Sequence, residues 1–212
     1  MRQRMRTAHG AACRLFLLAQ FALVQCFGFA SPVLAQAPVV KSDSARKRQP
    51  ALSPGPEVHY GTDRLPGPVQ DIREAILSAV RSGRIEELRH AWELNELKPD
   101  LGVAPAVGDP IAYWKRISGD GEGREILAAL GEILEAGYVV LPLGRDLENN
   151  KIYVWPYFVE VALDKLNPAQ EVEALRLVAP AALKEMRSAG KYTHWRIAIG
   201  ADGTWHSFRK GP

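Results

Sequence analysis

Apolar residues recur at helical spacing through much of the chain between residues 67 and 137. The most regular stripe lies in residues 124–136, and its apolar members are Ile126, Leu127, Leu130, Ile133 and Leu134. The same periodicity predicts helices over residues 69–80, 85–92 and 111–117. Gly83 and Gly137 follow two of these stretches as C-terminal glycines, and Asp109-Pro110 precedes another as an N-cap with proline at the first helical position.

The pattern changes after Gly137. Residues 138–143 and 152–158 are strand-like and are joined around residues 148–150, and residues 192–199 and 204–208 are predicted to form a closing hairpin. A helix is expected between them, starting at Asn167-Pro168 and broken or kinked by Pro180. The chain is therefore predicted to be α+β, with N-terminal helices packed on a small antiparallel sheet of about four strands that ends in a C-terminal hairpin.

Residues 200–204, Gly-Ala-Asp-Gly-Thr, suit a type I turn in which Gly203 takes a positive φ. This turn predicts that Ile199 pairs with Trp205 and that Ala198 pairs with His206. One face of the hairpin then belongs to the core through Trp195, Ile197, Ile199 and Trp205. The other face carries Tyr192, His194, Arg196 and His206.

Arg196 and His206 are candidates for an anion-binding pocket, and the alternative is that both are solvated polar residues on an exposed face. A metal site at the two histidines is not expected, because this register separates His194 and His206 by roughly 13 Å along the strand.

The segment 153–158 is unusually aromatic. Alternation places Tyr153, Trp155 and Tyr157 on one side of a strand. If these rings are exposed, they could stack on the sugar rings of cell-wall glycan; the alternative is that they belong to the core. Pro156 has no N–H to donate, which favours an edge strand or a bulge.

The first 35 residues have the pattern of a secretory signal peptide. Arg2, Arg4, Arg6 and Arg14 give a basic start, residues 15–30 are mostly apolar, and Val33-Leu34-Ala35 provides small residues for a signal peptidase. Cleavage is predicted after Ala35, with Ala37 or an uncleaved membrane anchor as alternatives. If the signal is removed, no segment of spanning length remains, and a periplasmic or secreted location is expected.

Removal of this segment changes the chemistry of the chain. Both cysteines, Cys13 and Cys26, lie in it, which leaves no thiol for disulfides, nucleophilic catalysis or metal binding. The full chain has 27 basic and 24 acidic residues, and loss of the four signal arginines reverses this excess, so nucleic-acid binding is not expected. Residues 36–66 are predicted to be a disordered, proline-rich linker, and residues 67–212 a single domain.

Known catalytic and cofactor motifs are not found. Residues 119–123, Gly-Asp-Gly-Glu-Gly, lack the spacing of a nucleotide fingerprint, and Asp120 is better interpreted as a capping or turn residue. The sequence therefore predicts no cofactor, no metal and no catalytic residue. A catalytic pair of carboxylates for glycoside cleavage is still possible, because the distance between two such residues is set by the fold and not by their spacing in the sequence.

Three stretches together resemble a group of uncharacterised exported bacterial proteins. They are residues 109–114, residues 153–158 and residues 199–205, and the resemblance spans about residues 68–209. No activity is assigned to that group, so the resemblance implies no catalytic residues. We expect an envelope protein that acts in non-catalytic binding or envelope maintenance, with cell-wall glycan or another envelope component as partner. The alternative is a cell-wall-active hydrolase.

Overall fold

The computed structural model describes residues 55–103, 108–144 and 150–211, which belong to one compact unit, Ala51–Pro212. The predicted signal peptide and most of the predicted linker lie outside the described residues. Within these ranges, none of the helices combines the length and the apolar character needed to cross a bilayer.

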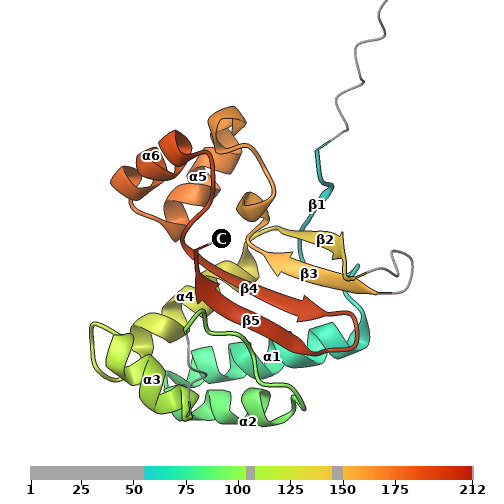
Figure 1. The fold of residues 1–212 in the computed structure, drawn as a ribbon, viewed down its shortest axis with the longest axis vertical. Coiled ribbons are helices and arrows are strands. Elements are labelled where there is room, and N and C mark those ends of the chain that lie inside the picture. Colours follow the sequence, from blue (N-terminus) through green and yellow to red (C-terminus); the bar gives the residue numbers. More distant parts are fainter. Residues whose placement is uncertain (1–54, 104–107, 145–149, 212) are drawn as a thin grey trace, which may run out of the picture. The chain divides into compact units, whose positions relative to one another are not determined.

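A five-stranded antiparallel sheet forms the centre of the fold (Figure 1). Its strands are adjacent in chain order: β1 (Val58–His59), β2 (Tyr138–Pro142), β3 (Lys151–Trp155), β4 (Trp195–Gly200) and β5 (Trp205–Lys210). Consecutive residues alternate between its two faces. Tyr138 and Trp155 belong to one buried cluster, and their neighbours Val139 and Val154 belong to the other.

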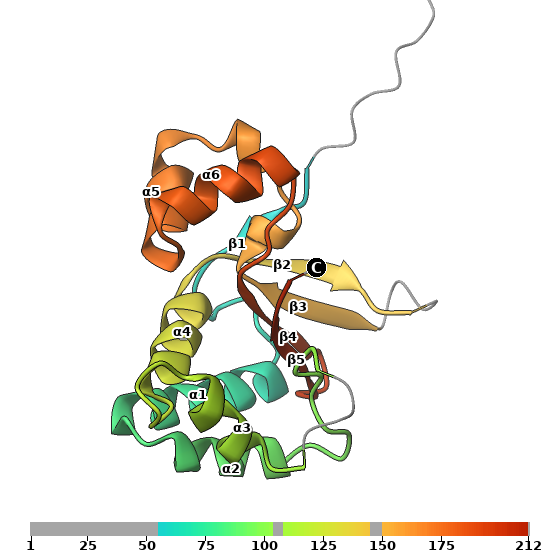
Figure 2. The ribbon, with the colours of Figure 1, turned by 60° about the vertical axis from the view of Figure 1, so that its left-hand side comes forward.

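Helices from the first half of the chain cover one face of the sheet (Figures 1 and 2). They are α1 (Gly67–Ser82), the 3-10 helix η1 (Ile85–Glu87), α2 (Leu88–Glu93), α3 (Pro110–Ile117) and α4 (Arg124–Glu135). The predicted stripe of α4 is buried against the sheet. Aromatic rings fill the centre of this layer, where Trp114 stacks on Trp205 with ring centroids 6.0 Å apart.

The second half of the chain supplies a smaller layer on the opposite face (Figure 2). It consists of η2 (Tyr157–Val159), η3 (Leu163–Lys165), α5 (Pro168–Leu177) and α6 (Pro180–Ala189). Phe158, Leu183, Met186 and Tyr192 pack there against Val139. The sheet is therefore the middle layer of three.

Local sequence signals set most helix ends as predicted, but the C-cap of α4 is Ala136 in an extended conformation rather than Gly137. The Asp109 side chain accepts the N–H of Ile111, and Asn167 forms a reciprocal capping box with Gln170. Gly83 ends α1 in the left-handed region at φ 67°. Pro180 starts α6, so the predicted break is a change from one helix to the next.

The structure corrects the predicted linker and the strand count. Val58 pairs with Val139, which adds β1 as a fifth strand within the segment expected to be unstructured. Leu65 is only 5% exposed, and the Tyr60 hydroxyl donates to Glu173 on α5 at 3.0 Å. Two strand residues are too few to produce a periodic signal, which is why the sequence pattern missed them.

The aromatic segment also differs from its prediction. Strand β3 ends at Trp155 and lies between β2 and β4, so it is a central strand rather than an edge strand. Tyr157 starts η2 and packs in the cluster opposite to that of Trp155. Pro156 follows the last strand residue, where its missing N–H removes no hydrogen bond from the ladder.

Candidate functional site

A bulge in the terminal hairpin decides which side chains face outward. Ile199 pairs with Trp205 as predicted, but Ala198 pairs with Ser207 rather than His206, which makes His206 the extra residue of a β-bulge. A one-residue shift moves every later side chain to the other face. Trp205 and Phe208 are three residues apart and both fully buried, and strict alternation could not bury both.

The bulge places two arginines opposite each other. Beyond it, Ile197 pairs with Phe208 and Arg196 with Arg209. The Cβ atoms of directly opposed residues are about 5 Å apart, so the two positive side chains start as close neighbours on the face of the sheet opposite α1–α4. The sequence pattern pointed to Arg196 but not to Arg209. The spacing of Trp205 and Phe208 was the signal that could have identified it.

Arg209 is held in place by the segment that follows α2. Its Nε lies 3.4 Å from Oδ2 of Asp100, and the other carboxylate oxygen of Asp100 accepts the N–H of Gly102 at 2.7 Å. The main chain of Asp100 also pairs with β5, donating to the carbonyl of His206 and accepting the N–H of Phe208. Gly102 lies directly over the Arg209 side chain, since a Cβ added there would meet Arg209 Cβ at 3.0 Å.

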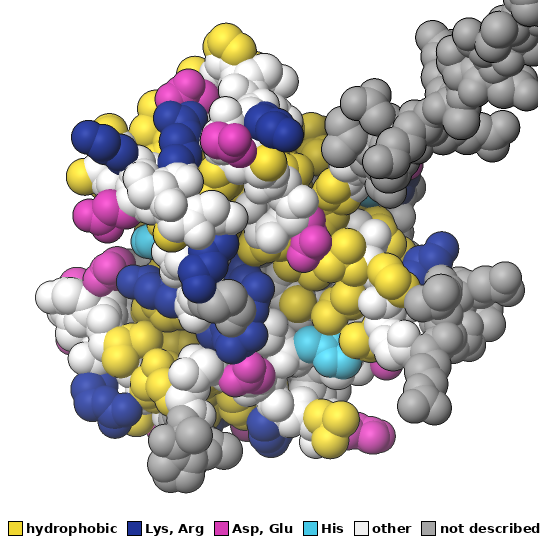
Figure 3. Space-filling view, turned by 45° about the horizontal axis from the view of Figure 1, so that its top comes forward, with side chains coloured by type: hydrophobic (Ala, Val, Ile, Leu, Met, Phe, Trp, Pro, Cys, Tyr) yellow, Lys and Arg dark blue, Asp and Glu magenta, His cyan; other side chains and the backbone are white. Residues whose placement is uncertain are grey.

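Arg196 has no such partner. No hydrogen bond or ion pair joins its guanidinium to another residue in the described part of the chain, although the side chain is half-buried. Its pKa is lowered from the usual value, first by desolvation and then by the positive charge of Arg209, while Glu160 and Asp100 oppose this shift. Figure 3 shows one face of the molecule, on which Lys and Arg side chains gather beside apolar side chains.

The structure does not join His206 to Arg196 in one pocket. His206 lies at the turn end of the hairpin, where a Cβ added to Gly200 would meet His206 Nε2 at 2.8 Å and Asp202 Oδ1 at 2.6 Å. Asp202 is engaged by the turn itself and accepts both the N–H and the hydroxyl of Thr204. Arg196 lies four residues from Gly200 along β4, roughly 13 Å away at the rise of a strand.

The three candidate aromatic residues are buried. Tyr153, Trp155 and Tyr157 are 6%, 1% and 0% exposed, and their rings pack on Tyr138, Phe158 and one another. Stacking on glycan required an exposed strip, so we do not assign these residues to the site. Their bulk serves the two cores on either side of the sheet.

One histidine does contact a carboxylate, the arrangement that would favour a hydrolase. His59 Nδ1 lies 3.7 Å from Glu57 Oε1, but Arg64 Nη1 lies between them, 2.7 Å from the carboxylate and 3.2 Å from Nδ1. Because a guanidinium only donates, Nδ1 must accept and Nε2 must carry the proton. The ring therefore has no free lone pair with which to act as a general base.

The side chain of Asp120 closes the glycine-rich loop before α4. Asp120 accepts the N–H groups of Gly123 and Arg124, both at 3.1 Å, and the hydroxyl of Ser118. These hydrogen bonds lower the pKa of the Asp120 carboxyl, with the Ser118 contact as the largest cause. The capping interpretation of Asp120 is confirmed.

Comparison with known proteins gives no relative to guide the assignment. No protein-family model, curated protein or solved structure matches the chain. The candidate site is therefore assigned on geometry alone: it is the pair Arg196 and Arg209 on the face of β4 and β5 opposite α1–α4.

Proposed function

We propose that this chain is an exported envelope protein that binds an anionic envelope component through Arg196 and Arg209, without catalysis. The observation that carries the proposal is the half-buried guanidinium of Arg196, which faces Arg209 in register and has no partner among the described residues. The signal-like N-terminus supports a periplasmic or secreted location.

The energetics of the pair support an anion as ligand. Like charges placed directly opposite each other on a sheet are destabilising, and burial adds the loss of hydration. A carboxylate or phosphate between the two guanidinium groups would relieve both effects, because arginine binds such groups in a bidentate manner. Asp100 pairs with Arg209 and not with Arg196, so the N–H donors of Arg196 are available to a ligand.

Cell-wall glycan with its peptide carboxylates suits this site better than bare sugar. The aromatic rings that would stack on sugar are buried, whereas the arginine pair recognises charge. The proposed partner is therefore a carboxylate-bearing wall polymer. The contact between His59 and Glu57 does not favour the hydrolase alternative, because Arg64 occupies the histidine nitrogen.

Retention of the protein on purified wall material tests the proposal. The chain, purified as cells process it, is incubated with wall material before and after amidation of the wall carboxylates. We expect Arg196→Gln to weaken retention about tenfold, since hydrogen bonds to charged groups contribute roughly 1.5–3 kcal/mol each. Amidation should weaken retention of the unaltered protein to a similar degree.

Arg81→Gln is the matched control. It removes the same charge from an exposed position in the last turn of α1, where Arg81 pairs with Glu74. Equal retention of the Arg196→Gln and Arg81→Gln proteins would show that Arg196 does not bind the wall. The location is tested separately, because mass spectrometry identifies the mature N-terminus as Gln36 or Pro38 if the signal is removed after Ala35 or Ala37.

A further inference from the structure

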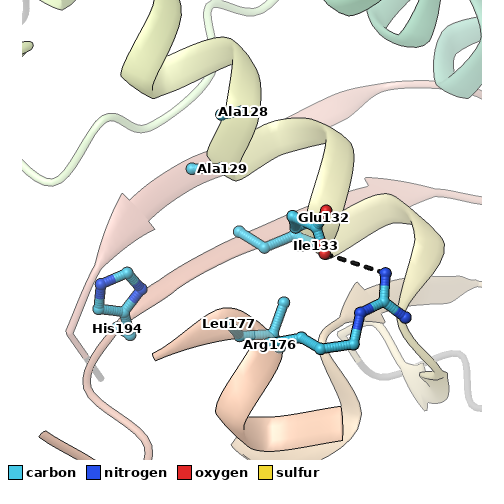
Figure 4. Close-up of a pocket in the computed structure, with 7 residues that line it drawn as sticks. All are labelled: Ala128, Ala129, Glu132, Ile133, Arg176, Leu177 and His194. Atoms are coloured by element: carbon cyan, nitrogen blue, oxygen red, sulfur yellow. Dashed lines mark hydrogen bonds and ion pairs between the residues drawn. The ribbon is translucent and has the colours of Figure 1, made fainter. Parts of the chain in front are cut away.

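A pocket lies where α4 meets α5, and its lining does not include the paired arginines. It has a volume of about 190 Å³ and is lined by α4, α5 and the residue before β4 (Figure 4). Its lining residues are Ala128, Ala129, Glu132, Ile133, Arg176, Leu177 and His194. The small side chains of Ala128 and Ala129 leave space that a larger residue on α4 would occupy.

The two ends of this pocket differ in chemistry. Figure 4 shows His194 at one end and the Arg176–Glu132 ion pair at the other, with Ile133 and Leu177 between them. The ion pair joins Arg176 Nη2 to Glu132 Oε2 at 3.0 Å, and Glu135 lies 3.9 Å from the same nitrogen. The positive charge of Arg176 is therefore already balanced, and two carboxylates lie near this one guanidinium group.

His194 supplies a free hydrogen-bonding group at the other end. Its pKa is lowered, first by burial and then by Lys210, with Glu125 opposing, so the ring is neutral at pH 7.5. A neutral imidazole has one N–H donor and one lone pair. No hydrogen bond or ion pair with the rest of the described chain occupies either ring nitrogen.

We propose that this pocket binds a neutral single-ring group that carries one hydroxyl, a phenol, with the ring between Ile133 and Leu177 and the hydroxyl on His194. The size fits, because an apolar cavity of about 150 Å³ is enough to hold benzene. With the hydroxyl on His194, a carboxylate at the far end of the ring would lie beside Glu132, whose charge Arg176 already balances.

Titration with p-cresol, followed by the NMR signals of the His194 ring and of the Ile133 and Leu177 amides, tests the proposal. We expect saturable shifts with a dissociation constant on the order of 1 mM, as for a ligand of this size. Toluene lacks the hydroxyl, and 4-hydroxybenzoate keeps the hydroxyl but carries a carboxylate in place of the methyl group, so each should bind at least tenfold more weakly. His194→Phe keeps a ring at this position and should remove the preference for p-cresol over toluene.

Ala128→Leu fills the pocket from an exposed helical position and should weaken p-cresol binding at least tenfold. Ala112→Leu makes the same change at an exposed position of α3 and should leave binding unchanged. N-acetyl-tyrosinamide distinguishes the source of the phenol: binding as tight as that of p-cresol assigns the pocket to a tyrosine of a partner chain, and weaker binding assigns it to a free phenol. The proposal is overturned if p-cresol gives no saturable shift, if toluene binds equally well, or if Ala128→Leu has no effect.

Discussion

Asn95 connects the end of α2 to the bulged strand, and its removal should destabilise the protein. It is 5% exposed, and its Oδ1 accepts the N–H of Trp205 at 2.6 Å while its Nδ2 donates to the carbonyl of Ala91 at 2.8 Å. Trp205 is fully buried, so in the unaltered protein Asn95 rather than solvent satisfies its N–H. Together with Asp100, which pairs with the next residues of β5, Asn95 covers the free edge of the sheet.

The magnitude follows from the groups left without partners. Asn95→Ala leaves one buried N–H and one helical carbonyl unsatisfied, each at a cost of about 1–3 kcal/mol, of which local relaxation recovers part. We expect a loss of about 2–4 kcal/mol in the free energy of unfolding. For a domain of this size, that corresponds to a fall in Tm of roughly 4–16 °C.

Differential scanning calorimetry and amide hydrogen exchange measure this effect. Glu96→Ala changes the neighbouring exposed residue and should leave Tm nearly unaltered, because Glu96 makes no side-chain hydrogen bond within the described residues. The Trp205 amide should lose protection in Asn95→Ala beyond the global change. A Tm within 1–2 °C of the unaltered protein, with the Trp205 amide still protected, would refute the assigned role of Asn95.

Three further changes test the packing. Gly203→Ala should cost roughly 1–3 kcal/mol in urea unfolding, since Gly203 has φ +87° and an added Cβ would lie 3.0 Å from the carbonyl oxygen of Pro68. Gly137→Ala should displace the Tyr157 ring, because the new Cβ would lie 2.8 Å from Tyr157 Cδ1. Unchanged chemical shifts of the Tyr157 ring would contradict this. Tyr192→Phe should stabilise the protein above pH 10. Burial raises the pKa of the Tyr192 hydroxyl, so the native state keeps a proton that the unfolded state releases, and stability falls by about 1.4 kcal/mol per pH unit; an unchanged alkaline unfolding midpoint in Tyr192→Phe would reject this.

The sequence predicted the elements whose signals are local. The stripe of α4, the Asp109 cap, the C-terminal glycine after α1 and the turn at Gly203 each depend on residues a few positions apart. Periodicity and side-chain capping act over that range, so these features could be identified without the fold. The α+β class followed from the order of the elements.

Only the tertiary structure decided what those elements present to solvent. The bulge at His206 turned Phe208 inward and Arg209 outward, because the core accepts both Trp205 and Phe208 only if one residue is left out of register. The order of β1 beside β2, the edge cover from Asn95 and the pocket at His194 join residues that lie far apart in the chain. Local pattern carries no information about such contacts, since they form only when distant segments compete for the same core.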